Sequence, residues 1–517
     1  MRFNDMMVRP GIYCAITLLG VSGYRSIAQT LPEPYLQIPE ARQLGWHSLE
    51  YYAFVHFGHN TFTGEEWGRS QSPPDVFNPT SLDTDQWAQS FAKAGMGGMI
   101  LTAKHHDGMA LWNSSTTTYK IANSAWAKNR KEQGLDSDVV RMAAESAKKY
   151  GIRFGIYLSP WDIHRDPAMP KPGLAGTIFD EPQIFGDASP GDYNELYSQQ
   201  LTELLTMELN DGSQINVFEL WLDGASGSDT VQTFDWAQYR DIIRKHQPEA
   251  VMWGHQGVDA RWVGNEDGYT LETNWHTINV TQDDARLSEQ DLMVGARDGT
   301  YWTPAESDAR IRDGWFWHEE EKPKAGDVLM AMYLKTVGRS VTLNLDVPPD
   351  TRGLIEDEDI ASLMEFKDRR ESLLGQGILQ PGANVTASSV REGDSDAYGP
   401  QNLLDGRDDS YWAMDDDETN GWVEIDLGYE RPVSGFIVQE HIALGQRVGS
   451  YTIEAFVGGE YTIVVNGTSI GYKRIDVLSK TVSTSQIRLS ITQSNAVPLL
   501  QQFQVLGSSD ISNTGRG

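Results

Sequence analysis

The chain has 517 residues, 39% of them hydrophobic, which is enough for about two or three domains with full cores. Its 73 acidic against 42 basic residues give a formal net charge of -31, which repels phosphate backbones and anionic membrane surfaces and argues against nucleic acid as a partner. Because Cys14 is the one cysteine in the sequence, disulfides within the chain and zinc–thiolate sites are excluded.

Residues 1–28 have the pattern of a secretory signal peptide. Arg2 and Arg9 precede the apolar stretch GIYCAITLLGV, and the small residues Ser26 and Ala28 come just before Gln29. The apolar stretch is too short to cross a bilayer, and no later run approaches the roughly 20 apolar residues that a spanning helix needs. We therefore expect an exported protein, secreted or periplasmic, without a membrane span.

Apolar, strand-like runs alternate with helix-like segments over residues 29–376, which is typical of parallel βα units. This succession favours a (β/α)8-like barrel over a doubly wound sheet, because no Gly-rich nucleotide-binding turn follows the first strand. The irregular stretch 270–327 predicts a distorted barrel. The predicted strands are 51–58, 95–106, 152–162, 216–225 and 250–257, and the helices between and after them are 82–95, 139–151, 193–207 and 234–248.

The pattern changes after the helix-like segment 361–374. From 377 to 507, short alternating strands are separated by Gly, Asn, Asp and Ser, which predicts an all-β antiparallel sandwich, and 508–517 has the composition of a disordered tail. The predicted sandwich strands include 421–428, 433–440, 449–456, 460–465 and 486–492.

Each predicted barrel strand is apolar until its last residues and then turns polar or aromatic. In (β/α)8 barrels, the C-terminal strand ends form the active-site face. We therefore expect the side chains at these ends to surround one pocket: His56, His105, His106, Tyr157, Asp223 and His255.

The histidines among them allow three interpretations. They could bind a metal such as zinc, but neighbours on a strand point to opposite faces, and the chain has no HxH or HxxxH pair. They could also be buried histidines with satisfied hydrogen bonds and no further role. In the third interpretation they bind sugar hydroxyls, because a neutral imidazole donates from one nitrogen and accepts at the other. The 16 tryptophans favour a sugar, whose C–H faces pack on aromatic rings.

Asp223 is the strongest single catalytic candidate. A carboxylate at the end of a run as apolar as VFELWLDGA has to be paired or catalytic. Glycoside hydrolysis needs two carboxyl groups, one as an ionised nucleophile and one as a proton donor. The second carboxyl group must come from a later strand end.

Seven motifs in order over residues 51–354 resemble the α-L-fucosidases of glycoside hydrolase family 29. They are YYAFVHFG with GEEWG, LTAKHHDGMALW, FGIYLSPWD, ELWLDGA, RWVGNE, DGWFWH and LNLDVPPDTRGL. The resemblance continues through EHIALGQRVGSYTIEAF and TSIGYKRI, so it covers most of the chain after the expected signal peptide.

This resemblance implies an exo-acting, retaining enzyme without a cofactor, in which Asp223 of WLDGA is the nucleophile. RWVGNE resembles the subgroup that cleaves α-1,3 and α-1,4 fucosyl linkages in branched, Lewis-type glycans, and implies that Glu266 is the acid/base. Glu272 is the competing carboxylate for that role. The implied contacts to the sugar are His56, Glu66, Trp67, His105, His106, Tyr157, Trp221, Arg261 and Trp315.

The C-terminal part resembles a discoidin-like, galactose-binding-type domain with NLLDGRDDSYW as its recognisable loop. Asp405 and Asp408 in this loop could bind a structural calcium or form a solvated acidic turn. Two other functions stay open: a retaining glycosidase for another sugar would keep both carboxylates, whereas a non-catalytic carbohydrate-binding protein would lack one. The presence of both Asp223 and Glu266 favours an enzyme.

Overall fold

The computed structural model describes residues 31–68, 72–166, 190–254, 258–279, 288–375, 377–379 and 383–507. The compact unit that contains the barrel and the sandwich begins at Pro34. The expected signal peptide, His255 and the C-terminal tail lie outside the described residues.

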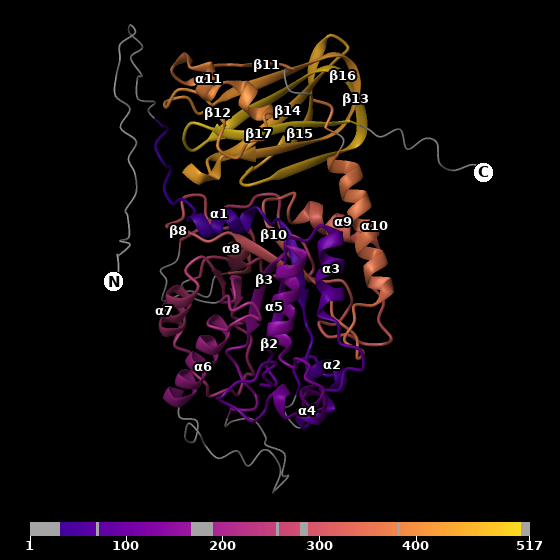
Figure 1. Cartoon of the computed structure of the whole chain (residues 1–517). Helices are drawn as coiled ribbons and strands as arrows, with labels where there is room; N and C mark the ends of the chain where they lie inside the picture. Colours follow the sequence, from indigo (N-terminus) through magenta and orange to yellow (C-terminus); the bar gives the residue numbers. More distant parts are fainter. Residues whose placement is uncertain are drawn as a thin grey trace, which may run out of the picture. The chain divides into compact units, whose positions relative to one another are not determined.

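Eight parallel strands form the barrel sheet, which confirms the predicted fold (Figure 1). The sheet order is β5-β4-β3-β2-β1-β10-β9-β6, and a parallel bridge from Trp253 to Ala260 links its two ends, so the barrel is nearly closed. The strands are β1 (Tyr51–Val55), β2 (Gly98–Lys104), β3 (Arg153–Leu158), β4 (Val217–Trp221), β5 (Val251–Trp253), β6 (Arg261–Trp262), β9 (Ala305–Arg310) and β10 (Thr342–Asp346).

The helices around the barrel begin and end where the sequence supplies caps. In α5 (Val139–Tyr150), the Asp138 side chain accepts a hydrogen bond from the Arg141 backbone N–H, and the helix ends at Gly151 with φ 72°. Helices α3 (Thr84–Ala94) and α5 run side by side in Figure 1, over strands β2 and β3. The other α-helices are α1 (Ala41–His47), α2 (Asn60–Thr63), α3 (Thr84–Ala94), α4 (Ala125–Glu132), α6 (Pro190–Leu205), α7 (Trp236–His246), α8 (Glu289–Val294), α9 (Gly326–Lys335) and α10 (Asp357–Leu374).

The barrel is distorted between β5 and β9, as the irregular stretch 270–327 predicts. Within 258–279 and 288–304, the described residues after β5 contain one helix, α8, and a short antiparallel pair of strands, β7 (Thr277–Ile278) and β8 (Tyr301–Trp302). No helix lies between β5 and β6 in the described residues, where a regular barrel would place one.

The C-terminal part is an antiparallel all-β fold, in agreement with the predicted sandwich. Its sheet order is β12-β17-β13-β16-β14-β15, with β11 paired to β13. The expected strands 421–428 and 433–440 are two halves of one strand, β13, whose register shifts between Asp426 and Arg431. The strands are β11 (Asn384–Ala387), β12 (Trp412–Ala413), β13 (Gly421–Glu440), β14 (Val448–Val457), β15 (Glu460–Gly467), β16 (Arg474–Ser494) and β17 (Leu499–Gly507), with one helix, α11 (Ser395–Tyr398).

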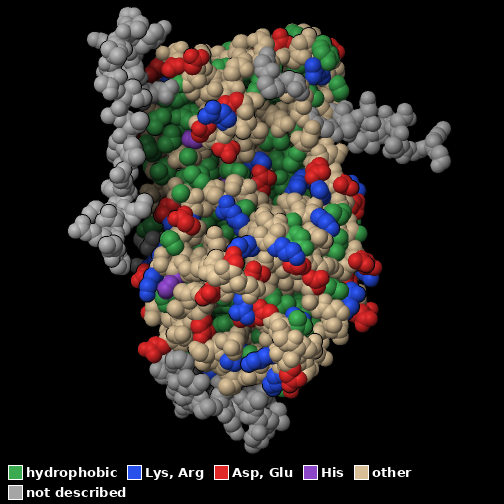
Figure 2. All heavy atoms as spheres, viewed as in Figure 1, with side chains coloured by type: hydrophobic (Ala, Val, Ile, Leu, Met, Phe, Trp, Pro, Cys, Tyr) green, Lys and Arg blue, Asp and Glu red, His purple; other side chains and the backbone are tan. Residues whose placement is uncertain are grey.

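Short 3-10 segments complete the described structure: η1 (Pro74–Val76), η2 (Ile121–Asn123), η3 (Arg391–Gly393), η4 (Pro400–Leu404) and η5 (Ile442–Leu444). No helix in the described ranges has both the length and the apolar character that crossing a membrane requires. On the face shown in Figure 2, acidic and basic side chains are interspersed rather than gathered in one patch.

Candidate active site

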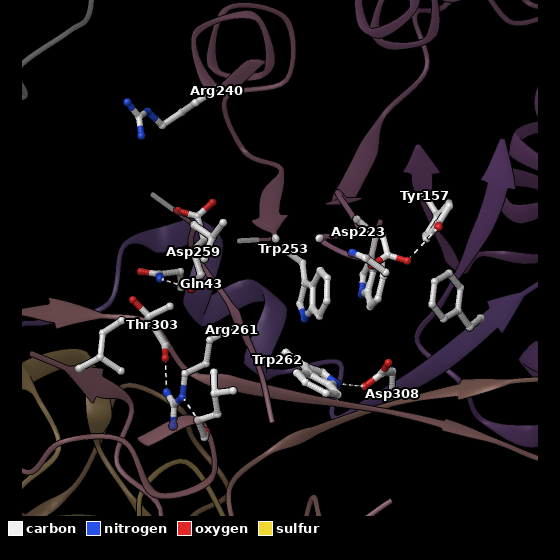
Figure 3. A pocket seen from close by; sticks show the side chains of 18 of the residues that line it. Gln43, Tyr157, Asp223, Arg240, Trp253, Asp259, Arg261, Trp262, Thr303 and Asp308 are labelled. Atoms are coloured by element: carbon white, nitrogen blue, oxygen red, sulfur yellow. Dashed lines mark hydrogen bonds between the residues drawn. The ribbon is translucent and has the colours of Figure 1, made fainter. Parts of the chain in front are cut away.

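A cavity of about 770 Å³ lies at the C-terminal ends of the barrel strands. It contains the predicted nucleophile, the predicted acid/base and most of the predicted sugar contacts, and Figure 3 shows one view of it. Every residue that the sequence assigned to the sugar site lines this cavity except Glu66. The predicted residues that line it are His56, Trp67, His105, His106, Tyr157, Trp221, Asp223, Arg261, Glu266 and Trp315.

Asp223 follows β4 and points into the cavity with a side chain that is 20% exposed. Its Oδ1 accepts a hydrogen bond from the Ala225 backbone N–H at 2.8 Å, and its Oδ2 accepts one from the Tyr157 hydroxyl at 3.0 Å (Figure 3). Burial by itself raises the pKa of this carboxyl. The hydrogen bond and charge of His106, together with the hydrogen bonds from Ala225 and Tyr157, outweigh burial and hold the pKa below its ordinary value. The carboxylate is therefore ionised and held in one orientation.

His105 and His106 follow β2 and have different surroundings. The His105 ring stacks on Tyr157, with centroids 5.5 Å apart and planes at 14°, and burial lowers its pKa well below the ordinary value. His106 places Nε2 3.4 Å from Asp223 Oδ2 and Nδ1 2.7 Å from Ser159 Oγ. Both rings reach the cavity because β2 ends at Lys104, after which the strict alternation of a strand no longer applies.

His56 follows β1 and is fixed by a carboxylate of the neighbouring strand β10. Its Nδ1 lies 2.8 Å from Asp346 Oδ1, and its backbone N–H donates to the same oxygen at 3.3 Å. Burial lowers the pKa of His56 to about 3, so the ring is neutral, and burial raises the pKa of Asp346 well above its ordinary value. A neutral ring held in this way can exchange hydrogen bonds with a polar ligand.

Trp221 and Trp253 form a stacked aromatic pair, with centroids 3.5 Å apart and planes at 8°. Trp221 also stacks on Tyr157 and donates from Nε1 to Glu306 Oε1 at 2.8 Å, in the barrel interior. Glu306 receives a second donor, Asn344 Nδ2, at 3.1 Å. This buried network fixes the tilt of Trp221, and the aromatic faces give the cavity an apolar wall suited to a sugar.

Glu266 lines the same cavity as Asp223 and is 44% exposed at its side chain. Its Oε2 lies 3.6 Å from an Arg310 guanidinium nitrogen. Asp308, on β9, lines the cavity as well and accepts a hydrogen bond from Trp262 Nε1 at 2.7 Å (Figure 3). Burial, and then the nearby Glu266 and Glu306 charges, raise the pKa of Asp308 well above its ordinary value.

Glu272 does not line this cavity. Its carboxylate pairs with Arg339 of the barrel and Arg474 of β16, and its backbone carbonyl accepts hydrogen bonds from Thr468 and Arg474. The geometry therefore favours Glu266 over Glu272 as the second carboxylate of the site.

Glu66 and Trp315 lie against each other at the edge of the cavity. Glu66 Oε2 accepts the Trp315 backbone N–H at 3.0 Å, and its Oε1 lies 3.0 Å from His318 Nε2. The Trp315 ring lies 5.0 Å from the His56 ring, centroid to centroid. Trp67 is 47% exposed and packs edge-on against His106, with centroids 5.3 Å apart. Glu66 thus holds Trp315 beside His56.

Arg261 lines the cavity at some distance from Asp223 in Figure 3. Its guanidinium donates to three backbone carbonyls, those of Leu292, Trp275 and Thr303, and burial lowers its pKa to about 9. These contacts hold the segments after β6 together. They use three of the five N–H donors of Arg261, and its role in sugar binding stays a prediction.

The four consecutive polar residues of LTAKHHDGMALW, KHHD, form two sets: two are buried away from the cavity and two face it. Lys104 is fully buried and donates from Nζ to Asp162 Oδ2 at 3.2 Å and to Gln200 Oε1 at 2.9 Å, away from the cavity. Asp107 is also buried, and burial raises its pKa to about 8. Lys104 and Asp107 are therefore structural, whereas His105 and His106 face the cavity.

The described residues contain no group of three or more His, Cys, Asp or Glu side chains placed to hold a metal ion. Asp405 accepts hydrogen bonds from the Arg407 backbone N–H and the Ser410 hydroxyl, and Asp408 accepts one from Gln501. This geometry favours the solvated acidic turn over the predicted calcium site.

The sequence interpretation missed several residues that support the site. Asp346 is the last residue of β10 (TLNLD), so the strand-end argument applied to 342–346 would have found it. Asp308 and Arg310 lie on β9, whose sequence AESDAR has no apolar run to mark it as a strand. Ser159 and His318 are loop residues that carry no signal of this kind.

Comparisons with known proteins agree with this geometry. Residues 30–368 match the family described as Alpha-L-fucosidase, and residues 384–501 match the F5/8 type C domain. The chain is 35% identical to Alpha-L-fucosidase 1 of Arabidopsis thaliana over 498 residues, covering 94% of this chain and 91% of that protein. It superposes on a family 29 fucosidase of Ruminococcus gnavus, solved in complex with fucose, with a TM-score of 0.82 and 29% identity, over 93% of this chain and 97% of that one.

Proposed function

The chain belongs to the α-L-fucosidase family of glycoside hydrolases, and on this premise we propose that it is an exo-acting, retaining α-L-fucosidase. Its substrates are branched, Lewis-type glycans, from which it removes α-1,3- and α-1,4-linked fucose. The protein is exported after cleavage of its first 28 residues, to the periplasm or the medium.

The observation that carries this proposal is the setting of Asp223. It is an ionised carboxylate with its two oxygens held by separate donors, next to aromatic rings and facing a cavity that a second carboxylate, Glu266, also lines. This arrangement supports a double displacement, in which Asp223 attacks the anomeric carbon while Glu266 protonates the leaving oxygen. Glu266, then a carboxylate, takes a proton from the water that releases fucose.

Three further side chains can contact a bound fucose: the imidazoles of His56 and His105 offer hydrogen bonds, and the stacked ring of Trp221 offers an apolar face. Neutral rings can both donate to and accept from hydroxyl groups, and burial keeps these two histidines neutral. The aromatic wall suits the C–H groups and the methyl group of the sugar. The shape of the pocket near Glu266 determines which linkage is accepted.

The proposal is tested with the purified enzyme and its Asp223→Asn variant on a panel of linear α-1,2-, branched α-1,3/1,4- and α-1,6-fucosylated oligosaccharides. We expect fucose to be released mainly from the branched oligosaccharides, and the variant to lose nearly all turnover because an amide forms no glycosyl ester. Time-resolved NMR should show α-L-fucose as the first product. Release of β-L-fucose first would exclude a retaining mechanism, and preference for linear substrates would exclude the linkage assignment.

Export is tested separately. The N-terminus of the protein recovered from the producing cell should begin at Gln29 and should be found outside the cytoplasm. An uncleaved N-terminus in the cytoplasm would contradict this part of the proposal.

A further inference from the structure

The hydrogen bonds of Ser159 determine which ring nitrogen of His106 carries a proton. Ser159 Oγ lies 2.5 Å from the Trp161 carbonyl oxygen and 2.7 Å from His106 Nδ1. A hydroxyl has one proton to donate, and two oxygens this close need that proton between them. Ser159 therefore donates to Trp161 and accepts from His106, whose Nδ1 must carry a hydrogen.

The other nitrogen of His106 faces the nucleophile. Its Nε2 lies 3.4 Å from Asp223 Oδ2, the oxygen that also accepts the Tyr157 hydroxyl. If His106 were neutral with its hydrogen on Nδ1, Nε2 would direct a lone pair at the carboxylate. A second proton, on Nε2, converts this repulsion into a charge-assisted attraction.

We propose that His106 is doubly protonated in the resting enzyme and that its imidazolium pairs with Asp223, which keeps the nucleophile ionised and oriented. This role goes beyond the sugar contact that the family resemblance implies, and it rests on the proposed role of Asp223 as nucleophile. His106 thus acts on the reacting carboxylate itself.

Among the described residues, the other groups that face His106 carry no positive charge. The proposed imidazolium is therefore the one cation beside Asp223. From its own element, His105 lies 4.3 Å away between ring centroids, and burial lowers the pKa of His105 well below its ordinary value. From β1, His56 is neutral for the same reason. From β3, Tyr157 keeps its hydrogen, because burial raises its pKa well above the ordinary value. The remaining neighbours, Trp67 and Trp161, are uncharged.

The pair changes during the reaction. When an Asp223 oxygen bonds to the anomeric carbon and the leaving oxygen takes the proton of Glu266, the Asp223 carboxylate loses its negative charge. The imidazolium then lacks the negative charge of Asp223, while Glu266 has become a carboxylate, until water, deprotonated by Glu266, displaces Asp223. The regained ion pair favours this second step, because it restores the attraction that ester formation removed.

The test uses the rate of covalent labelling by 2-deoxy-2-fluorofucosyl fluoride as a function of pH. Fluoride leaves without a proton from Glu266, so the acidic limb of the profile reports the ionisation of Asp223. In His106→Gln, which keeps an N–H donor but loses the charge, we expect this limb to move up by about 1 to 3 pH units. The matched control, His59→Gln, changes a buried histidine that does not line the cavity, and its limb should stay where the wild-type limb lies.

Nitrogen-15 NMR of the histidine-labelled wild-type enzyme is the second measurement, and it needs neither a variant nor turnover. Both ring nitrogens of His106 should be protonated at the pH where labelling is fast. An unprotonated Nε2, or a His106→Gln limb that coincides with the wild-type limb, would overturn the proposal. If the wild-type enzyme is not labelled on Asp223 at all, the proposed function itself is wrong, and the two failures are told apart.

Discussion

Replacing Lys104 by methionine should destabilise the barrel, although Lys104 does not touch the cavity. Its ammonium is fully buried and pairs with Asp162, whose side chain is only 3% exposed. Methionine fills nearly the same volume but leaves the carboxylate without its cation. Breaking a buried pair from one side costs about 3 to 5 kcal/mol. Because Asp162 Oδ1 keeps a hydrogen bond from the Arg165 backbone N–H, we expect a loss of about 3 kcal/mol, roughly a hundredfold in the folded-to-unfolded ratio.

The assay is urea unfolding of wild type, Lys104→Met, Asp162→Asn and the double variant, followed by tryptophan fluorescence at two pH values. The pKa of Asp162 is held low in the wild type, where burial is outweighed by Lys104 together with the charges of His164 and Arg165, so its contribution to stability is present above about pH 4 and is lost below it. In Lys104→Met the pKa of Asp162 rises, because burial is the largest single influence on it and only the weaker charges of His164 and Arg165 still oppose burial. The loss should therefore grow as the pH rises above about 4.

The double variant decides between an ion pair and simple packing. With both charges gone, part of the lost stability should return, and the two single losses should not add. A Lys104→Met variant that loses less than about 1 kcal/mol, or whose loss does not change with pH, would refute the reasoning.

Two further predictions follow from buried or cavity-lining carboxyl groups. Glu266→Ala should impair natural oligosaccharides far more than aryl fucosides with acidic leaving groups, and azide should rescue it as α-fucosyl azide. Glu272→Ala, outside the cavity, should show neither effect, and the reverse result would contradict the assignment. Glu440 in the sandwich has its pKa raised by burial to about 7, so the folded state binds an extra proton between about pH 4.5 and 7 and stability falls as pH rises through that window. Glu440→Gln should flatten this slope in thermal unfolding, and an unchanged slope would show that another group titrates.

The strands that precede Asp223 and the histidines of the site could be predicted because they are continuous apolar runs. β1 to β5 are buried on both faces, so their sequences show both their extent and the point at which polar residues begin. β9 could not be found in this way. Glu306 and Asp308 of β9 point into the barrel, where Tyr52 and Trp262 donate hydrogen bonds to them, and a sequence shows no such partners.

The residues of the site could likewise be predicted only in part from the sequence. The position of Asp223 after ELW is local information, whereas the choice between Glu266 and Glu272 depends on which way a loop turns. Only the fold shows that Arg339 and Arg474 hold Glu272 elsewhere. The role of Lys104 was equally hidden, because its partners Asp162 and Gln200 are far away in the chain.

The strands on the two sides of the pocket are hydrogen-bonded to different extents. β1 to β4, which Asp223 and the histidines follow, are joined by ladders with a register shift in two of them, whereas β5 and β6 have three and two residues and meet through a single bridge at Trp253. A seam with so few hydrogen bonds opens at a lower free energy than the rest of the sheet. We therefore expect the wall formed by Trp253 and Trp262 to move at a lower free-energy cost than the segment that holds Asp223.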